Sequence, residues 1–106
     1  MRAMTVVKFK PKPGMEEEFE ALYKSLKREF DGLRRMSLVK STDGGYFGVG
    51  EWDSFDHLVA ARQAMQDNLD KFRHTLSSFS EDMGVTDAMS GNVAFRWKFD
   101  GAVNGQ

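Results

Sequence analysis

Residues 33–52 read LRRMSLVKSTDGGYFGVGEW, and the fold follows from this stretch. Residues 33–41 and 46–52 are rich in β-branched, aromatic and other apolar residues, which is typical of strands. Between them, Thr42-Asp43-Gly44-Gly45 supplies glycines for the positive φ angles that tight hairpin turns require. The sequence therefore predicts an antiparallel hairpin near the middle of the chain.

One helix is predicted on each side of this hairpin. Apolar residues recur at three- and four-residue steps over residues 15–30, with Glu16–Glu18 in the first turn, where acidic side chains suit the helix dipole. Asp31-Gly32 is expected to end this helix. After the hairpin, Asp53-Ser54 offers an N-cap, and helical spacing of apolar residues continues over 55–76.

Strands are expected at both ends of the domain. Residues 4–10 alternate between apolar and polar until Pro11-Lys12-Pro13-Gly14 stops them, and residues 92–99 alternate with four apolar side chains on one side. Residues 77–91 are polar and predict a loop. The order β-α-β-β-α-β predicts an α+β, ferredoxin-like domain over residues 1–99, followed by a tail at 100–106. In that fold a four-stranded antiparallel sheet carries both helices on one face.

The face of the sheet without helices is also apolar. In the first strand, Val7 and Phe9 point to one side while Met4 and Val6 point to the other, and the hairpin strands show the same two-sided pattern. A sheet with one solvent-exposed face should instead alternate apolar with polar residues along each strand. The pattern favours a homodimer joined through the sheet face, and a tolerated apolar surface is the alternative.

Composition excludes several classes of protein. The 106 residues include no cysteine, which removes disulfides, thiolate metal sites and a cysteine nucleophile. The net charge is −1 without a concentrated basic stripe, so nucleic-acid binding is not expected. No apolar run approaches the roughly 20 residues of a membrane span, and a cytoplasmic protein is expected.

Two motifs resemble the antibiotic biosynthesis monooxygenase family. They are Lys12-Pro13-Gly14 at the entry to the first helix and Glu51-Trp52-Asp53-Ser54 at the end of the third strand, and the likeness covers roughly residues 3–99. The resemblance implies a dimeric α/β barrel with a ligand cavity between helices and sheet. Some members oxidise polycyclic phenols or quinols without metal or flavin, because the substrate anion itself activates oxygen.

Other members of the family degrade haem, and the resemblance is weaker there. That branch uses an asparagine on the first strand, a tryptophan on the second helix and a histidine further along that helix. Residues 4–10 contain no asparagine and residues 55–76 no tryptophan, so only His74 falls near an expected position. Neither haem turnover, nor a bound metal, nor any other cofactor is expected.

Arg62 and His57 are the candidate catalytic residues. Arg62 falls inside the apolar arc of the second predicted helix, where a guanidinium can bind a phenolate, enolate or carboxylate through two hydrogen bonds. The alternative is an arginine whose aliphatic chain packs against apolar neighbours while its guanidinium reaches water. His57 lies in the first turn of the same helix and can act as a base if it faces the ligand. A surface histidine is the alternative.

Tyr23, Trp52, Trp97 and His74 are the candidate ligand-binding residues. The two tryptophans offer flat apolar walls, for which core packing is the alternative, and the Tyr23 hydroxyl can hold a substrate oxygen. His74 points away from the apolar arc, so exposure to solvent is its alternative.

These observations predict a cofactor-independent, monooxygenase-like protein that acts on a small aromatic or quinol ligand. His57 or a water would first deprotonate the substrate, and Arg62 would stabilise the resulting anion. A non-catalytic dimeric ligand-binding or stress-response module is the alternative, and a haem-binding protein using His74 is a third hypothesis.

Overall fold

The computed structural model describes residues 1–99. Within this range the chain forms four strands, two α-helices and one short 3-10 helix. The elements are β1 Ala3–Phe9, α1 Glu16–Ser25, β2 Leu33–Lys40, β3 Tyr46–Trp52, α2 Phe55–Phe72, η1 Arg73–Thr75 and β4 Thr86–Asn92.

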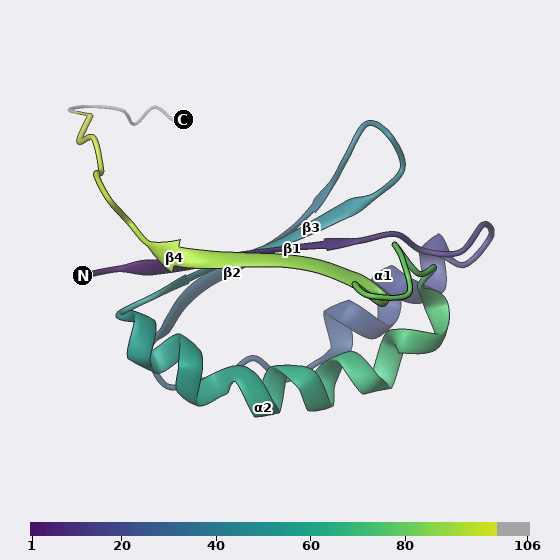
Figure 1. The fold of residues 1–106 in the computed structure, drawn as a ribbon, viewed down its shortest axis with the longest axis horizontal. Coiled ribbons are helices and arrows are strands. Elements are labelled where there is room, and N and C mark those ends of the chain that lie inside the picture. Colours follow the sequence, from purple (N-terminus) through teal and green to yellow (C-terminus); the bar gives the residue numbers. More distant parts are fainter. Residues whose placement is uncertain (100–106) are drawn as a thin grey trace.

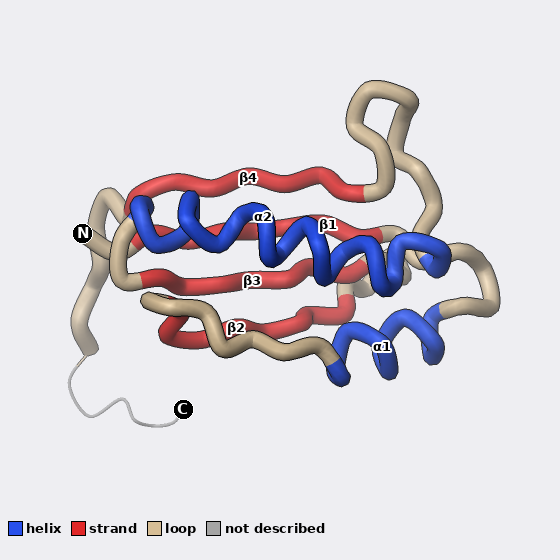
Figure 2. The backbone as a smooth tube through the Cα atoms, turned by 90° about the horizontal axis from the view of Figure 1, so that it is seen from below, coloured by secondary structure: helices blue, strands red, loops and turns tan. Residues whose placement is uncertain are grey.

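The strands form one antiparallel sheet in the order β2-β3-β1-β4, and both helices lie on the same face of it (Figures 1 and 2). The central hairpin forms where the glycines predict it: the Ser41 amide donates to the Gly45 carbonyl at 2.8 Å, and Gly44 has φ +91°. Ser54 caps α2, since its hydroxyl accepts from the His57 amide at 3.2 Å. The predicted ferredoxin-like fold and the N-cap are confirmed.

The prediction that the first helix extends to Phe30 is wrong, because α1 ends at Ser25. Leu26 is already extended, and the Arg28 guanidinium turns back to donate to the carbonyls of Tyr23 and Leu26. Carbonyls at a helix C-terminus lack partners within the helix, so these two bonds stabilise the early end. The apolar spacing up to Phe30 reflects side chains buried by an extended segment.

The prediction of a fourth strand at residues 92–99 is also wrong. β4 spans Thr86–Asn92, and all of it except Asn92 lies in the stretch predicted as a loop. β1 begins at Ala3, which pairs with Asn92, so the neighbouring strand ends where the aromatic alternation begins. Only one further bond, from the Val93 amide to the Arg2 carbonyl at 2.7 Å, continues the pairing. Residues 93–99, called the arm below, leave the sheet and expose Phe95, Trp97 and Phe99.

The core between helices and sheet is divided in two. One cluster is aromatic, with neighbouring ring centroids 4.9–5.7 Å apart, and it gathers where α1 meets the end of α2. The second surrounds Trp52 and Leu58 near the start of α2. The buried members of the first are Phe9, Phe19, Tyr23, Tyr46, Phe72 and Leu76. The gap between the two clusters is where the candidate site lies.

The other face of the sheet, called the open face below, carries no helix (Figure 1). Its apolar side chains follow from the strand alternation and pairing, which place Val6 opposite both Val49 and Met89. The apolar members are Met4, Val6, Val39, Phe47, Val49 and Met89. The arm rises from the end of β4 on this same side of the sheet (Figure 1).

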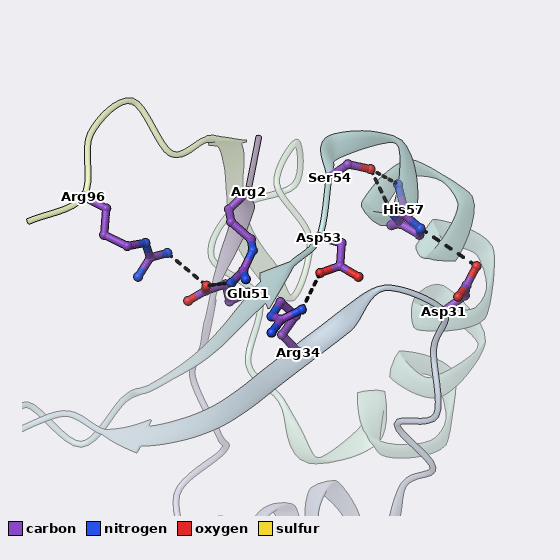
Figure 3. Close-up of polar contacts among 8 residues, drawn as sticks. All are labelled: Arg2, Asp31, Arg34, Glu51, Asp53, Ser54, His57 and Arg96. Carbon is purple, nitrogen blue, oxygen red and sulfur yellow. Dashed lines mark hydrogen bonds and ion pairs between the residues drawn. The ribbon is translucent and has the colours of Figure 1, made fainter. Parts of the chain in front are cut away.

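Glu51 is a buried carboxylate on the open face, held by two arginines (Figure 3). Arg2 donates to its Oε2 at 2.6 Å, and Arg96 of the arm donates to the same oxygen at 2.9 Å. Burial by itself raises the pKa of Glu51, but the two guanidinium groups outweigh burial and hold the pKa below its ordinary value. The ion pair therefore anchors the arm to the sheet at neutral pH.

A depressed pKa makes this anchor sensitive to acid. The stabilisation is complete above the ordinary glutamate pKa and is lost as the pH falls through the lower pKa of the folded protein. We expect the free energy of unfolding of wild type to fall more between pH 6 and about pH 3 than that of Glu51→Gln, measured by urea titration. Glu17→Gln, an exposed change on α1, should retain the wild-type loss. Parallel pH profiles for wild type and Glu51→Gln would contradict this assignment.

Candidate functional site

A cavity of about 380 Å³ lies between the two core clusters, enclosed by the sheet on one side and by α2 and the 26–30 segment on the other. Small-ligand sites typically measure about 300–1,000 Å³ and are mostly apolar with a few polar groups. The apolar lining comes from both clusters and from the strands between them. Its main members are Val7, Phe9, Leu26, Phe30, Met36, Leu58, Met65, Leu69 and Phe72.

Small residues on the strands keep this space open. Gly48 and Gly50 present no side chain to the helix side of β3. A Cβ at Gly48 would lie 2.6 Å from the Tyr23 hydroxyl oxygen, and one at Gly50 would lie 2.9 Å from Thr5 Oγ1. Both distances are shorter than real Cβ contacts, so a side chain at either position would displace Tyr23 or Thr5; of the two glycines, Gly48 lines the cavity. The stretch of β3 at Gly48, which has no side chain, therefore forms part of the cavity wall next to the Tyr23 hydroxyl.

Tyr23 brings a buried hydroxyl to the cavity. It is only 9% exposed, sits on the inner side of α1 and contacts the aromatic cluster. Burial raises its pKa above the ordinary value, and the positive charge of Arg28 opposes that shift without cancelling it. Tyr23 is therefore a neutral phenol near pH 7 and can donate a hydrogen bond to a ligand oxygen.

Two guanidinium groups line the cavity, those of Arg28 and Arg62. Arg62 is exposed and lies 5.6 Å from the ring centroid of Phe55, which places it on the solvent side. Arg28 is half-buried, with its guanidinium 4.3 Å from the centroid of the Tyr23 ring. Sequence reasoning missed Arg28, because on a helix reaching Phe30 it belongs to the polar side. Only the early end of α1 turns it inward.

The tryptophans lie outside the cavity lining. Trp52 is fully buried in the second cluster, with its ring centroid 6.1 Å from that of Phe30 and its indole N–H 3.4 Å from Thr5 Oγ1. Trp97 is 68% exposed on the arm and packs edge-on against Phe95. Neither indole is brought to the ligand space within this chain.

The histidines also lie away from the cavity lining. The His57 ring sits at the start of α2, with Nδ1 2.7 Å from the Ser54 hydroxyl and Nε2 3.9 Å from an Asp31 oxygen (Figure 3). His74 is exposed, and its Nε2 lies 2.8 Å from a Glu18 oxygen. Of the predicted site residues, the fold brings together Tyr23 and Arg62, and it adds Arg28.

Among residues 1–99, no group of three or more histidine, aspartate or glutamate side chains is arranged to hold a metal ion. Within the same range, neither α-helix is long and apolar enough to cross a membrane. The arrangement that remains is an apolar cavity with cationic and phenolic groups at its edge, which suits an aromatic ligand bearing an acidic oxygen.

The family model for antibiotic biosynthesis monooxygenases matches residues 2–75. The chain belongs to this family. The match covers β1 to the end of η1 and so includes both helices that form the cavity roof. No curated protein sequence matches this family member.

Several solved structures share the fold of this chain. A protein from Mycobacterium tuberculosis has a TM-score of 0.74 at 16% identity, over 92% of this chain and 100% of that one. The cofactor-independent oxygenase SnoaB from Streptomyces nogalater has a TM-score of 0.70 at 15% identity, over 90% and 95%. A monooxygenase from Streptomyces coelicolor, in complex with nanaomycin D, has a TM-score of 0.65 at 22% identity, over 91% and 90%. These likenesses establish the fold.

Proposed function

We propose that this protein is a cofactor-independent monooxygenase that oxidises a small polycyclic phenol or quinol in the cavity. The observation that carries the proposal is a partly open, mostly apolar cavity lined by a neutral phenol and two arginines. An apolar cavity of about 150 Å³ holds one benzene, so about 380 Å³ suits a ligand of two or three fused rings. The family and the oxygenases among its structural relatives support the same class of reaction.

The reaction needs only the substrate, dioxygen and proton transfer. Loss of the phenolic proton to water produces an electron-rich anion, which Arg62 and the Tyr23 hydroxyl stabilise. The anion transfers one electron to dioxygen, and the resulting radicals combine into a ring peroxide anion, which takes the proton back from water to give the hydroperoxide. Loss of water from the peroxide leaves a quinone, so one oxygen atom enters the product and the other leaves as water. Water serves as the base here because His57 lies outside the cavity lining.

The activity is tested with 1-naphthol and anthrone in an oxygen electrode, against the uncatalysed rate in the same buffer. We expect oxygen uptake in proportion to enzyme and one atom of ¹⁸O from labelled dioxygen in each quinone formed. Tight binding without oxygen uptake would instead support the alternative, a non-catalytic ligand-binding module.

Removing the Tyr23 hydroxyl should weaken ligand binding without harming the fold. Tyr23→Phe keeps the ring contacts and deletes one hydrogen-bond donor to a charged ligand oxygen. We therefore expect the affinity for an anionic ligand, measured by calorimetric titration, to fall about 10- to 100-fold. Tyr46→Phe is the matched control, since the Tyr46 hydroxyl bonds Glu20 away from the cavity. Equal losses in both variants would remove Tyr23 from the site.

We further propose that the protein works as a homodimer joined through the open face. The support is the apolar open face itself, together with the exposed aromatic residues of the arm on the same side of the sheet. The buried Glu51 on that side is paired with Arg2 and Arg96, so its carboxylate would not be left without a partner in an interface. A second copy, related by two-fold symmetry, would cover both features at once.

A further inference from the structure

The charged residues that line the cavity are all cationic. Of the described residues that line it, Arg28 and Arg62 are cationic and none is an aspartate or glutamate. Of the five other arginines in the described part of the chain, Arg2, Arg34, Arg73 and Arg96 each pair with a carboxylate, and Arg35 on β2 does not. Within residues 1–99, Arg28 and Arg62 make no such pair. An apolar space edged by two unneutralised cations favours an anion.

Arg28 is the better oriented of the two. Its Nη1 donates to the Leu26 carbonyl at 2.9 Å and its Nη2 donates to the Tyr23 carbonyl, while its plane lies over the Tyr23 ring. A guanidinium has five N–H donors, so two carbonyl bonds fix its direction and leave other donors for a ligand. Arg62, by contrast, is exposed, and its one aromatic contact is with the ring of Phe55.

We infer that Arg28 is a specificity-determining residue that, with the Tyr23 hydroxyl, binds the ionised ring oxygen of a planar acidic ligand. The ligand class is therefore a fused-ring enol or phenol acidic enough to bind as its anion, with its apolar rings lying toward Gly48 and Phe72. This inference rests on the proposed ligand class and deepens it. Arg62, on the solvent side of the cavity, attracts the ligand anion but does not orient it.

The test compares two ligands that share a ring system and differ in charge and by one methyl group. 2-Hydroxy-1,4-naphthoquinone is an anion at neutral pH, and 2-methoxy-1,4-naphthoquinone is its neutral ether. The chain contains no cysteine that could add to either quinone. Wild type at pH 7 should bind the anion at least about tenfold more tightly than the ether by calorimetric titration, as a hydrogen bond between charged groups implies.

Arg28→Gln should weaken binding of the anion about 10- to 100-fold and leave the ether within about twofold. Arg73→Gln removes the same charge from the surface, and both affinities should stay at wild-type values. Arg28→Lys keeps the charge and a donor for the helix carbonyls, so it should fold as wild type and show an intermediate loss for the anion alone.

A purely structural Arg28 would lower both affinities together, and that result would overturn the inference. It would also be overturned if wild type bound the anion no better than the ether, or bound neither ligand at millimolar concentration. The oxygen-uptake assay separates this inference from the proposed function. Charge-selective binding that depends on Arg28, without oxygen uptake from any substrate, would refute the enzyme and retain the anion site.

Discussion

Replacing Val49 with glutamate is expected to convert the protein from a dimer of about 24 kDa into a folded monomer of 12.0 kDa. Val49 lies on the open face of central strand β3, paired with Val6 of β1. In a monomer the new carboxylate faces water and costs little. In a sheet-to-sheet dimer it is buried without a partner, which costs about 3–5 kcal/mol, and symmetry introduces it twice.

The dissociation constant should therefore rise by at least about 1,000-fold, since each 1.4 kcal/mol corresponds to a factor of ten. Sedimentation velocity at micromolar concentration measures this, and circular dichroism checks the fold. Val59→Glu places the same change on the outer surface of α2, where Val59 is 43% exposed, and should leave the dimer intact. A monomeric wild type, or a Val49→Glu variant that stays dimeric, would exclude the open face as the interface.

Trp52→Ala is expected to cause the largest loss of stability in the domain. The indole is fully buried, and replacing such a side chain with alanine typically costs about 3–5 kcal/mol, because contacts are lost and a cavity remains. Small domains are stable by only about 5–15 kcal/mol, so the midpoint of thermal unfolding should fall by about 15–30 °C. Calorimetry or circular dichroism on heating measures the change.

The same position separates a core role from a ligand-binding role. Trp52→Phe keeps an aromatic ring beside Phe30 and should lose clearly less stability. Since Trp52 does not line the cavity, the affinity of this variant for 2-hydroxy-1,4-naphthoquinone should stay within about threefold of wild type. A loss of about tenfold or more at nearly unchanged stability would instead place Trp52 in the ligand site.

Most secondary structure was predictable where the signal is local. The hairpin depends on Gly44 and Gly45, and the start of α2 depends on Ser54, so neighbours in sequence suffice to determine them. Strand alternation also assigned Val7 and Phe9 to the face opposite Val6, as the pairing confirms. These features follow from backbone stereochemistry and from the period of two in a strand.

The predictions fail where the structure of a segment is determined by contacts with residues far away in the sequence. The alternation after Asn92 is as clear as any in the chain, yet β4 forms earlier, because its register is determined by β1. The Thr86, Ala88 and Ser90 side chains that this register turns inward are small, and they line the cavity. Alternation reports that a segment has two unlike sides, and it contains no information about which strand that segment pairs with.

The sequence by itself determined the order of elements, the family motifs and a sheet with apolar residues on both faces. Those properties are written in residue periods and turn residues, which act over a few positions. Only the tertiary structure decided what surrounds the ligand space. Arg28 enters the cavity because α1 ends at Ser25, while Trp52 leaves it because Phe30 and Leu58 close around the indole. A cavity is the volume that distant elements leave unfilled, so its lining depends on how they pack together and not on any one segment.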